Sequence, residues 1–301
     1  MTFISDMKQT LKNNWIFYLI GAAFCLGLKL YYRSADSCGL MWILTPTARW
    51  AGILGGYAFE NIPHTGYVNH DLQFIIAKSC SGVQFMVITL AALIFSYTHF
   101  ITSRLGTKKG FLWLALSLLL SYASTVLVNG LRIVLSIDLP PVLEKQGILR
   151  DLLTPEQLHT AIGCAVYFSS LLVIYRFAGR LSLRITGSCR LSGGFCDRLT
   201  ESSSIADCKS GKKGKLRQLI PPAFWYLFVV LGIPLLHHGK NGYEQFAEYA
   251  ALITVICTAV LGVNLLFSNQ NGRRLSLTAA GRFLQKTAWS VVHRNKRYRA
   301  K

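Results

Sequence analysis

Three polar residues stand at the ends of apolar segments, and together they could perform acyl transfer. Cys80 lies in SCSG directly before a long apolar run, Arg132 lies in NGLRI near the end of another, and His159 opens a third. A thiol, a permanent cation and a titratable base are the groups that a cysteine nucleophile requires. A central arginine in a membrane segment costs about 2.5 to 3.5 kcal/mol on insertion scales, so Arg132 is the strongest of these signals.

The residues around the cysteine fit the same chemistry. A helix N-terminus carries partial positive charge, which favours a thiolate at Cys80. Ser79 or Ser81 can cap that helix end. Gly82 leaves room for a substrate to approach the backbone, and Gln84 follows it at the start of the helix.

The remaining members of the predicted site lie on the next two helices. Asn129 is one turn before Arg132 on the same face and can position it. Arg132 can stabilise a thiolate or the oxyanion of a tetrahedral intermediate. His159 can take the thiol proton and return it to the leaving amine. Taken singly, a packed cysteine, a snorkelling arginine and a capping histidine would also explain these residues. Their joint placement favours one shared site.

The composition indicates a multi-pass membrane protein. Hydrophobic residues make up 52% of the 301 residues and charged residues only 15%, which departs from soluble domains in both respects. Six apolar runs have about the 20 residues needed to cross the hydrocarbon layer: 15–32, 82–101, 111–135, 159–178, 219–236 and 247–267. The predicted fold is therefore an all-α, multi-pass transmembrane helical bundle.

The segments between these runs complete the predicted fold. Residues 38–59 are apolar but contain Pro46 and Arg49, so we expect an interfacial or re-entrant helix. Alternating and β-branched residues on either side of NHD predict a small β-hairpin before Cys80. Residues 138–158 are expected to form an outer loop with a short amphipathic helix, and the next helix begins at 154–156 with an early proline.

The distribution of charge predicts the orientation in the membrane. The net charge is +19, and basic residues concentrate in 101–110, 176–217 and 268–301, next to membrane runs. The positive-inside rule places these segments and both termini in the cytoplasm of a bacterial cell and the site outside its cytoplasmic membrane. The basic segments are expected to contact anionic lipids. We expect no nucleic-acid partner, although the aromatic and basic tail leaves that alternative open.

The cysteines predict no metal site, and no cofactor is expected. No two of the eight form a C-x-x-C pair, and no histidine lies at zinc-finger spacing from them. The predicted organisation is a membrane core over 1–185, a basic cytoplasmic linker over 186–217, and an additional transmembrane hairpin with a basic cytoplasmic tail over 218–301.

The motifs also resemble a known family. SCSGVQF (79–85), NGLRI (129–133) and LHTAIG (158–163) occur in that order, after LTPTARWAGILGG. Over residues 38–178 the chain is similar to the exosortase and archaeosortase family, and most similar to the exosortase K type. The resemblance implies that Cys80 is the nucleophile, Arg132 the family's invariant arginine and His159 the third member. Many members have an arginine where this chain has Gln84.

The resemblance also implies a substrate class. Exported proteins carrying a C-terminal motif, a transmembrane helix and a basic cluster would be cleaved at the outer membrane face through a thioester. An amine acceptor or water would resolve that thioester, giving surface anchoring or proteolysis. Two alternatives remain. One is a transporter or assembly scaffold in which Arg132 and His159 line a polar passage. The other is a serine protease using Ser79 or Ser81 with His159, although no G-x-S-x-G elbow supports it.

Overall fold

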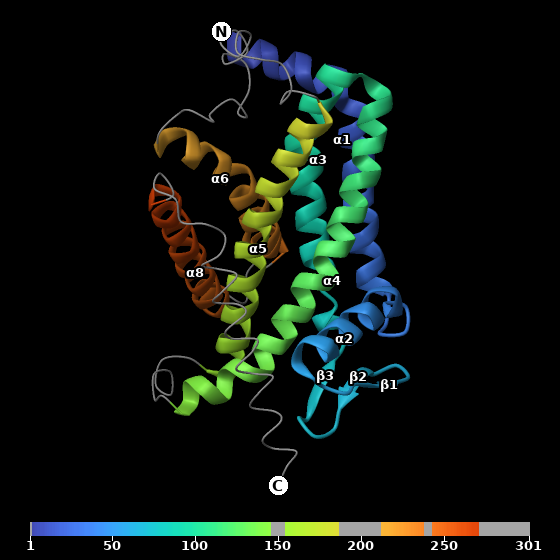
Figure 1. The fold of residues 1–301 in the computed structure, drawn as a ribbon, viewed down its shortest axis with the longest axis vertical. Helices are drawn as coiled ribbons and strands as arrows, with labels where there is room; N and C mark the ends of the chain where they lie inside the picture. Colours follow the sequence, from blue (N-terminus) through green and yellow to red (C-terminus); the bar gives the residue numbers. More distant parts are fainter. Residues whose placement is uncertain (1, 146–153, 187–211, 238–242, 271–301) are drawn as a thin grey trace.

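The protein is a bundle of long helices with a small sheet at one end (Figure 1). The computed structural model describes residues 2–145, 154–186, 212–237 and 243–270. Its main helices are α1 (Thr2–Ser34), α2 (Met41–Gly55), α3 (Val83–Leu105), α4 (Thr107–Lys145), α5 (Pro155–Ile185), α6 (Lys212–Leu227), α7 (Ile233–His237) and α8 (Tyr243–Gln270). A 3₁₀ turn, η1 (Lys78–Cys80), precedes α3, and a π-helical turn, η3 (Phe228–Gly232), joins α6 to α7.

Five helices of the described ranges are long and apolar enough to cross a membrane, which indicates a multi-pass membrane protein. They are Asn14–Ser34, Lys78–Ser103, Thr107–Leu143, Pro155–Ile185 and Phe246–Leu265. The sixth predicted run is the shorter apolar segment Leu219–Leu235, where α6, η3 and α7 follow one another. A count of six spans therefore stays a prediction.

Helix α3 lies at the centre of the bundle. It packs against α1, α4, α5 and α6, and 67% of its apolar span is buried, compared with 11% for α1 and for α8. Large apolar side chains such as Leu19, Val173 and Val255 are exposed on the outer helices. An apolar outer surface of this kind suits contact with lipid chains.

The long helices alternate in direction, so the two ends of the bundle differ. Helices α1 and α4 run one way and α3 and α5 the other (Figure 1). The turn between α3 and α4 and the end of α5 therefore share one end, while the sheet and Cys80 lie at the opposite end. The basic segments next to these helices were expected to share one side. Their assignment to the cytoplasm stays a prediction.

A three-stranded antiparallel sheet leads into the cysteine. Strands β1 (Glu60–Ile62), β2 (Gly66–Asn69) and β3 (Phe74–Ile76) lie in the order β1-β2-β3. The expected hairpin corresponds to β2 and β3, in which Tyr67 pairs with Ile76, and β1 is an additional strand. The Tyr67 hydroxyl lies 2.9 Å from Oγ1 of Thr45 in α2 and donates to it, which ties the sheet to that helix.

The end of α4 corrects one boundary. We expected a loop from residue 138, but α4 continues to Lys145 with Pro140 and Pro141 inside it. Prolines remove two helical N–H donors, and the Tyr57 hydroxyl donates a hydrogen bond to Asp138 that anchors this segment. Burial is the main cause that raises the pKa of Tyr57 well above its usual value, and the hydrogen bond to Asp138 raises it further. The rest of that loop (146–153), most of the predicted linker (187–211) and most of the basic tail (271–301) lie outside the described residues.

The contact between α2 and α4 gives a first test. A side chain on Gly130 would lie 2.4 Å from Cδ1 of Trp50, and the Trp50 indole N–H donates to the Leu127 carbonyl at 3.1 Å. Gly130→Ala is expected to lower the free energy of unfolding by about 1 to 3 kcal/mol through overpacking. Thermal unfolding of the detergent-purified protein measures this change. Gly27→Ala is the matched control, since a side chain there meets nothing within 4 Å. Equal melting temperatures for the two variants would contradict the close packing of Trp50 against Gly130.

Candidate active site

Cys80 lies in the turn that leads into α3. It ends η1, and α3 begins at Val83 with Gly82 as its N-cap. Gly82 has φ 75°, a left-handed conformation that favours glycine. A side chain there would also come within 3.0 Å of Asn129 in α4. The glycine is therefore required for the close approach of α3 and α4, whereas the sequence had suggested only room for a substrate.

The serines beside Cys80 do not have the capping role that we expected. No side chain caps α3, because the left-handed Gly82 occupies the N-cap position. Ser79 is exposed, with its Oγ 4.0 Å from Sγ of Cys80, and Ser81 is only 1% exposed. Gln84 is exposed in the first turn of α3. The expected serine cap is therefore wrong. Ser79, Ser81, Gly82 and Gln84 instead line a cavity.

Arg132 and His159 are brought together by α4 and α5. Nη2 of Arg132 lies 2.7 Å from Nε2 of His159. Arginine can only donate hydrogen bonds, so Nε2 is the acceptor and the imidazole is neutral with its proton on Nδ1. The N-terminus of α5 fixes this placement: Thr154 and Gln157 form a reciprocal capping box with Pro155 in the first turn. The predicted start of this helix is confirmed.

A chain of hydrogen bonds connects the pair to the backbone of the cysteine. The Asn129 amide donates to the carbonyl of Cys80 at 2.6 Å. The Tyr167 hydroxyl donates to Oδ1 of Asn129 at 2.7 Å and accepts from Nη1 of Arg132 at 3.4 Å. The Arg132 guanidinium also lies over the Tyr167 ring, 5.4 Å from its centroid, a distance typical of a cation–π contact. Asn129 is fully buried, so both of its polar atoms have the partners that burial requires.

Three residues of this network, Arg132, His159 and Tyr167, line a cavity of about 220 Å³. Arg132 and His159 line it from one side, and the residues next to Cys80 line it from another. The C-terminal helices close the wall with Tyr226 and Tyr249. The side chain of Cys80 is not part of this lining: it is 9% exposed and packs in an apolar cluster with residues of α2, β3 and α4.

The thiol nevertheless lies close to the polar network. Sγ of Cys80 lies 4.0 Å from Oγ of Ser79, which lines the cavity, and the Cys80 carbonyl accepts from Asn129. The structure thus places Arg132 in direct contact with His159, and Tyr167 links Arg132 to Asn129. The Cys80 sulfur lies outside the cavity lining, although Ser79 and Ser81 on either side of it belong to that lining. We had expected the sulfur on the cavity surface.

One donor of Arg132 is left over. Within the described part of the chain, Nε of Arg132 is buried and has no hydrogen-bond partner. It faces Gly163 of α5, where an added side chain would lie 3.0 Å away. Buried donors without partners are rare in native proteins and point to a missing ligand or a change of conformation.

Sequence reasoning missed Tyr167, the residue that links Asn129 to Arg132. A signal was present: His159, Gly163 and Tyr167 are spaced four residues apart and lie along one helix face. The glycine between the two polar residues marks the place where Arg132 approaches α5. Tyrosines are common in membrane helices, so the pattern alone did not separate Tyr167 from packing residues.

No protein-family model, curated protein or solved structure matches this chain. The case for its function therefore depends on the site itself.

The importance of Tyr167 can be tested by removing its hydroxyl. Tyr167→Phe leaves a buried oxygen of Asn129 without a donor, which is expected to cost about 1 to 3 kcal/mol of stability and to disorganise Arg132. Tyr97→Phe is the control, because its hydroxyl also donates within the membrane core, to the Tyr175 carbonyl at 2.8 Å, away from the cavity. Thermal unfolding should detect a loss in both variants. Only Tyr167→Phe should impair the function of the site, and an equal functional effect would assign Tyr167 to packing.

Proposed function

We propose that this protein is a membrane-embedded cysteine transpeptidase or protease of the exosortase type, which cleaves C-terminal sorting signals of exported proteins at the outer membrane face. One observation carries the proposal: hydrogen bonds join the backbone of Cys80 through Asn129 and Tyr167 to the Arg132–His159 pair beside a cavity. A substrate with a transmembrane tail would lie beside these helices, so its cleavage motif would be held near the cavity and proximity would supply part of the catalysis.

The first chemical step follows from the bond between Arg132 and His159. While Nη2 of Arg132 occupies Nε2 of His159, the imidazole cannot accept a proton there. A peptide carbonyl entering the cavity would draw the guanidinium toward its oxygen, where negative charge develops. Nε2 of His159 would then be free to take the thiol proton. Binding of the substrate would thereby activate the base.

Bond formation requires the sulfur to reach the cavity. Cys80 lies between two residues that line it, so rotation of its side chain would bring Sγ from the apolar cluster to the wall. The sulfur attacks the carbonyl carbon, the peptide C–N bond breaks, and His159 returns its proton to the leaving amine. The tail departs, and an amine acceptor or water then attacks the thioester carbonyl. The C–S bond breaks, the product leaves, and the proton of the attacking group returns to the Cys80 sulfur.

A second candidate is a transporter or scaffold in which Arg132 and His159 line a polar passage. The observation that favours it is the absence of Cys80 from the cavity lining. In that function the thiol would only pack against its apolar neighbours, and its chemistry would not matter. The two candidates therefore differ in whether the sulfur atom is needed.

Replacing the sulfur separates the two candidates. Cys80→Ala should abolish processing of a co-expressed protein that carries a C-terminal motif, a hydrophobic helix and a basic cluster, because no other atom replaces the nucleophile. An immunoblot of the substrate measures its shift in size, with enzyme abundance measured in parallel. Cys164→Ala is the matched control, since Cys164 is also buried and lines the same cavity. Normal processing by Cys80→Ala would rule out the cysteine mechanism.

The geometry of the cation gives a second functional test. Arg132 donates to two acceptors through different nitrogens, and lysine keeps the charge but cannot reproduce this planar fork. Arg132→Lys should lower the processing rate by about 100-fold or more, as the loss of one oxyanion donor does. Initial rates in membranes measure the effect. Arg49→Lys, at an exposed position of α2, should have no effect, and retained activity in Arg132→Lys would favour a passage that needs only positive charge.

A further inference from the structure

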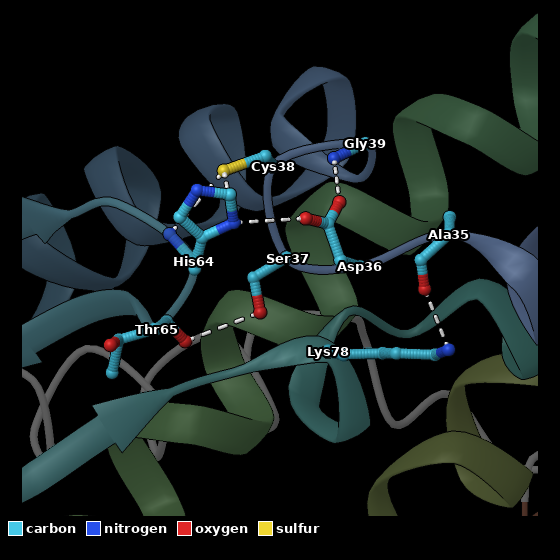
Figure 2. Close-up of polar contacts among 8 residues, drawn as sticks. All are labelled: Ala35, Asp36, Ser37, Cys38, Gly39, His64, Thr65 and Lys78. Carbon is cyan, nitrogen blue, oxygen red and sulfur yellow. Dashed lines mark hydrogen bonds and ion pairs between the residues drawn. The ribbon is translucent and has the colours of Figure 1, made fainter.

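Three side chains with metal-binding atoms meet outside the membrane-spanning helices. Asp36 and Cys38 lie in the connection between α1 and α2, and His64 lies in the turn between β1 and β2 (Figure 2). Their ligand atoms all lie within 4.8 Å of one another. Nδ1 of His64 is 3.2 Å from Oδ2 of Asp36 and 3.7 Å from Sγ of Cys38. None of the three lines the cavity beside Arg132.

We propose that Asp36, Cys38 and His64 form a zinc site with a fourth position open to water or to a partner's side chain. Carboxylate, thiolate and imidazole are the ligands that zinc takes from proteins. Zinc bonds of about 2.3 Å to sulfur and about 2.0 to 2.2 Å to nitrogen and oxygen, at tetrahedral angles, place N and O about 3.3 Å apart and N and S about 3.6 Å apart. The two observed separations are close to these values.

Neighbouring groups orient the ligands. The N–H of Gly39 donates to Oδ1 of Asp36 at 2.8 Å, which leaves Oδ2 toward His64. The backbone N–H of His64 donates to Sγ of Cys38 at 3.3 Å, which holds the sulfur beside the imidazole. Outer contacts of this kind commonly fix the ligands of metal sites.

The backbone also holds the two segments together. His64 has φ 63°, a left-handed conformation that is uncommon for residues other than glycine. Ser37 donates to the carbonyl of Thr65 at 3.2 Å, next to His64 in the chain (Figure 2). Such backbone conformations persist where the surrounding structure requires them. Here the conformation places Nδ1 of His64 near Oδ2 of Asp36 and Sγ of Cys38.

A metal at this position would support the segment that leads to Cys80. The Lys78 ammonium donates to the carbonyls of Arg33 and Ala35 at 3.1 and 2.7 Å, beside the same connection and two residues before Cys80. Zinc would therefore tie the connection between α1 and α2 to the sheet, and the sheet positions the turn of Cys80. The proposed metal would cross-link these two segments through its three protein ligands, and this role stands independently of the proposed enzymatic function.

Cobalt titration of the detergent-purified full-length chain tests the site. Cys189, Cys196 and Cys208 are first replaced by serine to remove the thiols of the predicted linker. One Co²⁺ per chain should bind and give a thiolate-to-cobalt charge-transfer band with the strong visible bands of tetrahedral cobalt, and Zn²⁺ should displace it. Added Zn²⁺ should also raise the melting temperature of this protein.

Variants of the three ligands distinguish a built site from loose binding. Cys38→Ser should abolish the charge-transfer band and the rise in melting temperature. His64→Ala should weaken cobalt binding by about tenfold or more, and Asp36→Asn should retain the band with reduced affinity. His70→Ala is the matched control: it is an exposed histidine beside an acid, 3.8 Å from Glu60, and should bind as the parent does.

Circular dichroism must show the parent's helical content in each variant, so that lost binding is not lost folding. If Cys38→Ser alone loses helical content, Asp36→Asn and His64→Ala decide the result by their cobalt affinities. A charge-transfer band that persists in a folded Cys38→Ser, equal affinities for His64→Ala and His70→Ala, or no stoichiometric cobalt binding in the parent would each overturn the proposal.

Discussion

The guanidinium of Arg132 is the group around which the site is organised. A permanent cation inside a helical bundle is costly unless it is paired or hydrogen-bonded. Among the described residues its partners are the neutral His159, the Tyr167 hydroxyl and the Tyr167 ring, and none of the ion pairs there involves it. Its positive charge is therefore not cancelled by a carboxylate of this region. A cavity beside such a charge attracts negative charge, including that which develops on a carbonyl oxygen during attack.

Close helix packing makes this arrangement possible. Glycines occupy the points where α3, α4 and α5 approach one another: Gly82 against Asn129, and Gly163 against Nε of Arg132. The capping box at Thr154 sets where α5 begins and hence the height at which His159 meets α4. Each of these features is local, yet together they determine a contact between side chains that are far apart in sequence.

Much of the site was predictable because membrane segments make polar residues conspicuous. The contact between Arg132 and His159 and the involvement of Asn129 were predicted from their places near the ends of the apolar runs 111–135 and 159–178. The buried position of the Cys80 sulfur, the strand β1 and the extension of α4 past Pro140 did not follow, because each depends on tertiary contacts that leave no periodic signal. The contact between Asp36 and His64 was also hidden, since helix α2 and strand β1 lie between them in the chain.

The bond between Asn129 and the Cys80 carbonyl bears on which function the site serves. Asn129 uses its amide for Cys80 and its oxygen for Tyr167, so the place of the cysteine backbone depends on the same network that holds Arg132. A polar passage requires the cation and the histidine but has no need to fix the backbone beside a buried thiol. An acyl-transfer site requires the Arg132–His159 pair and also a fixed cysteine backbone. The attacking sulfur and the group that stabilises the oxyanion must stay at a constant distance from each other through the reaction. The network therefore favours the enzyme over the passage.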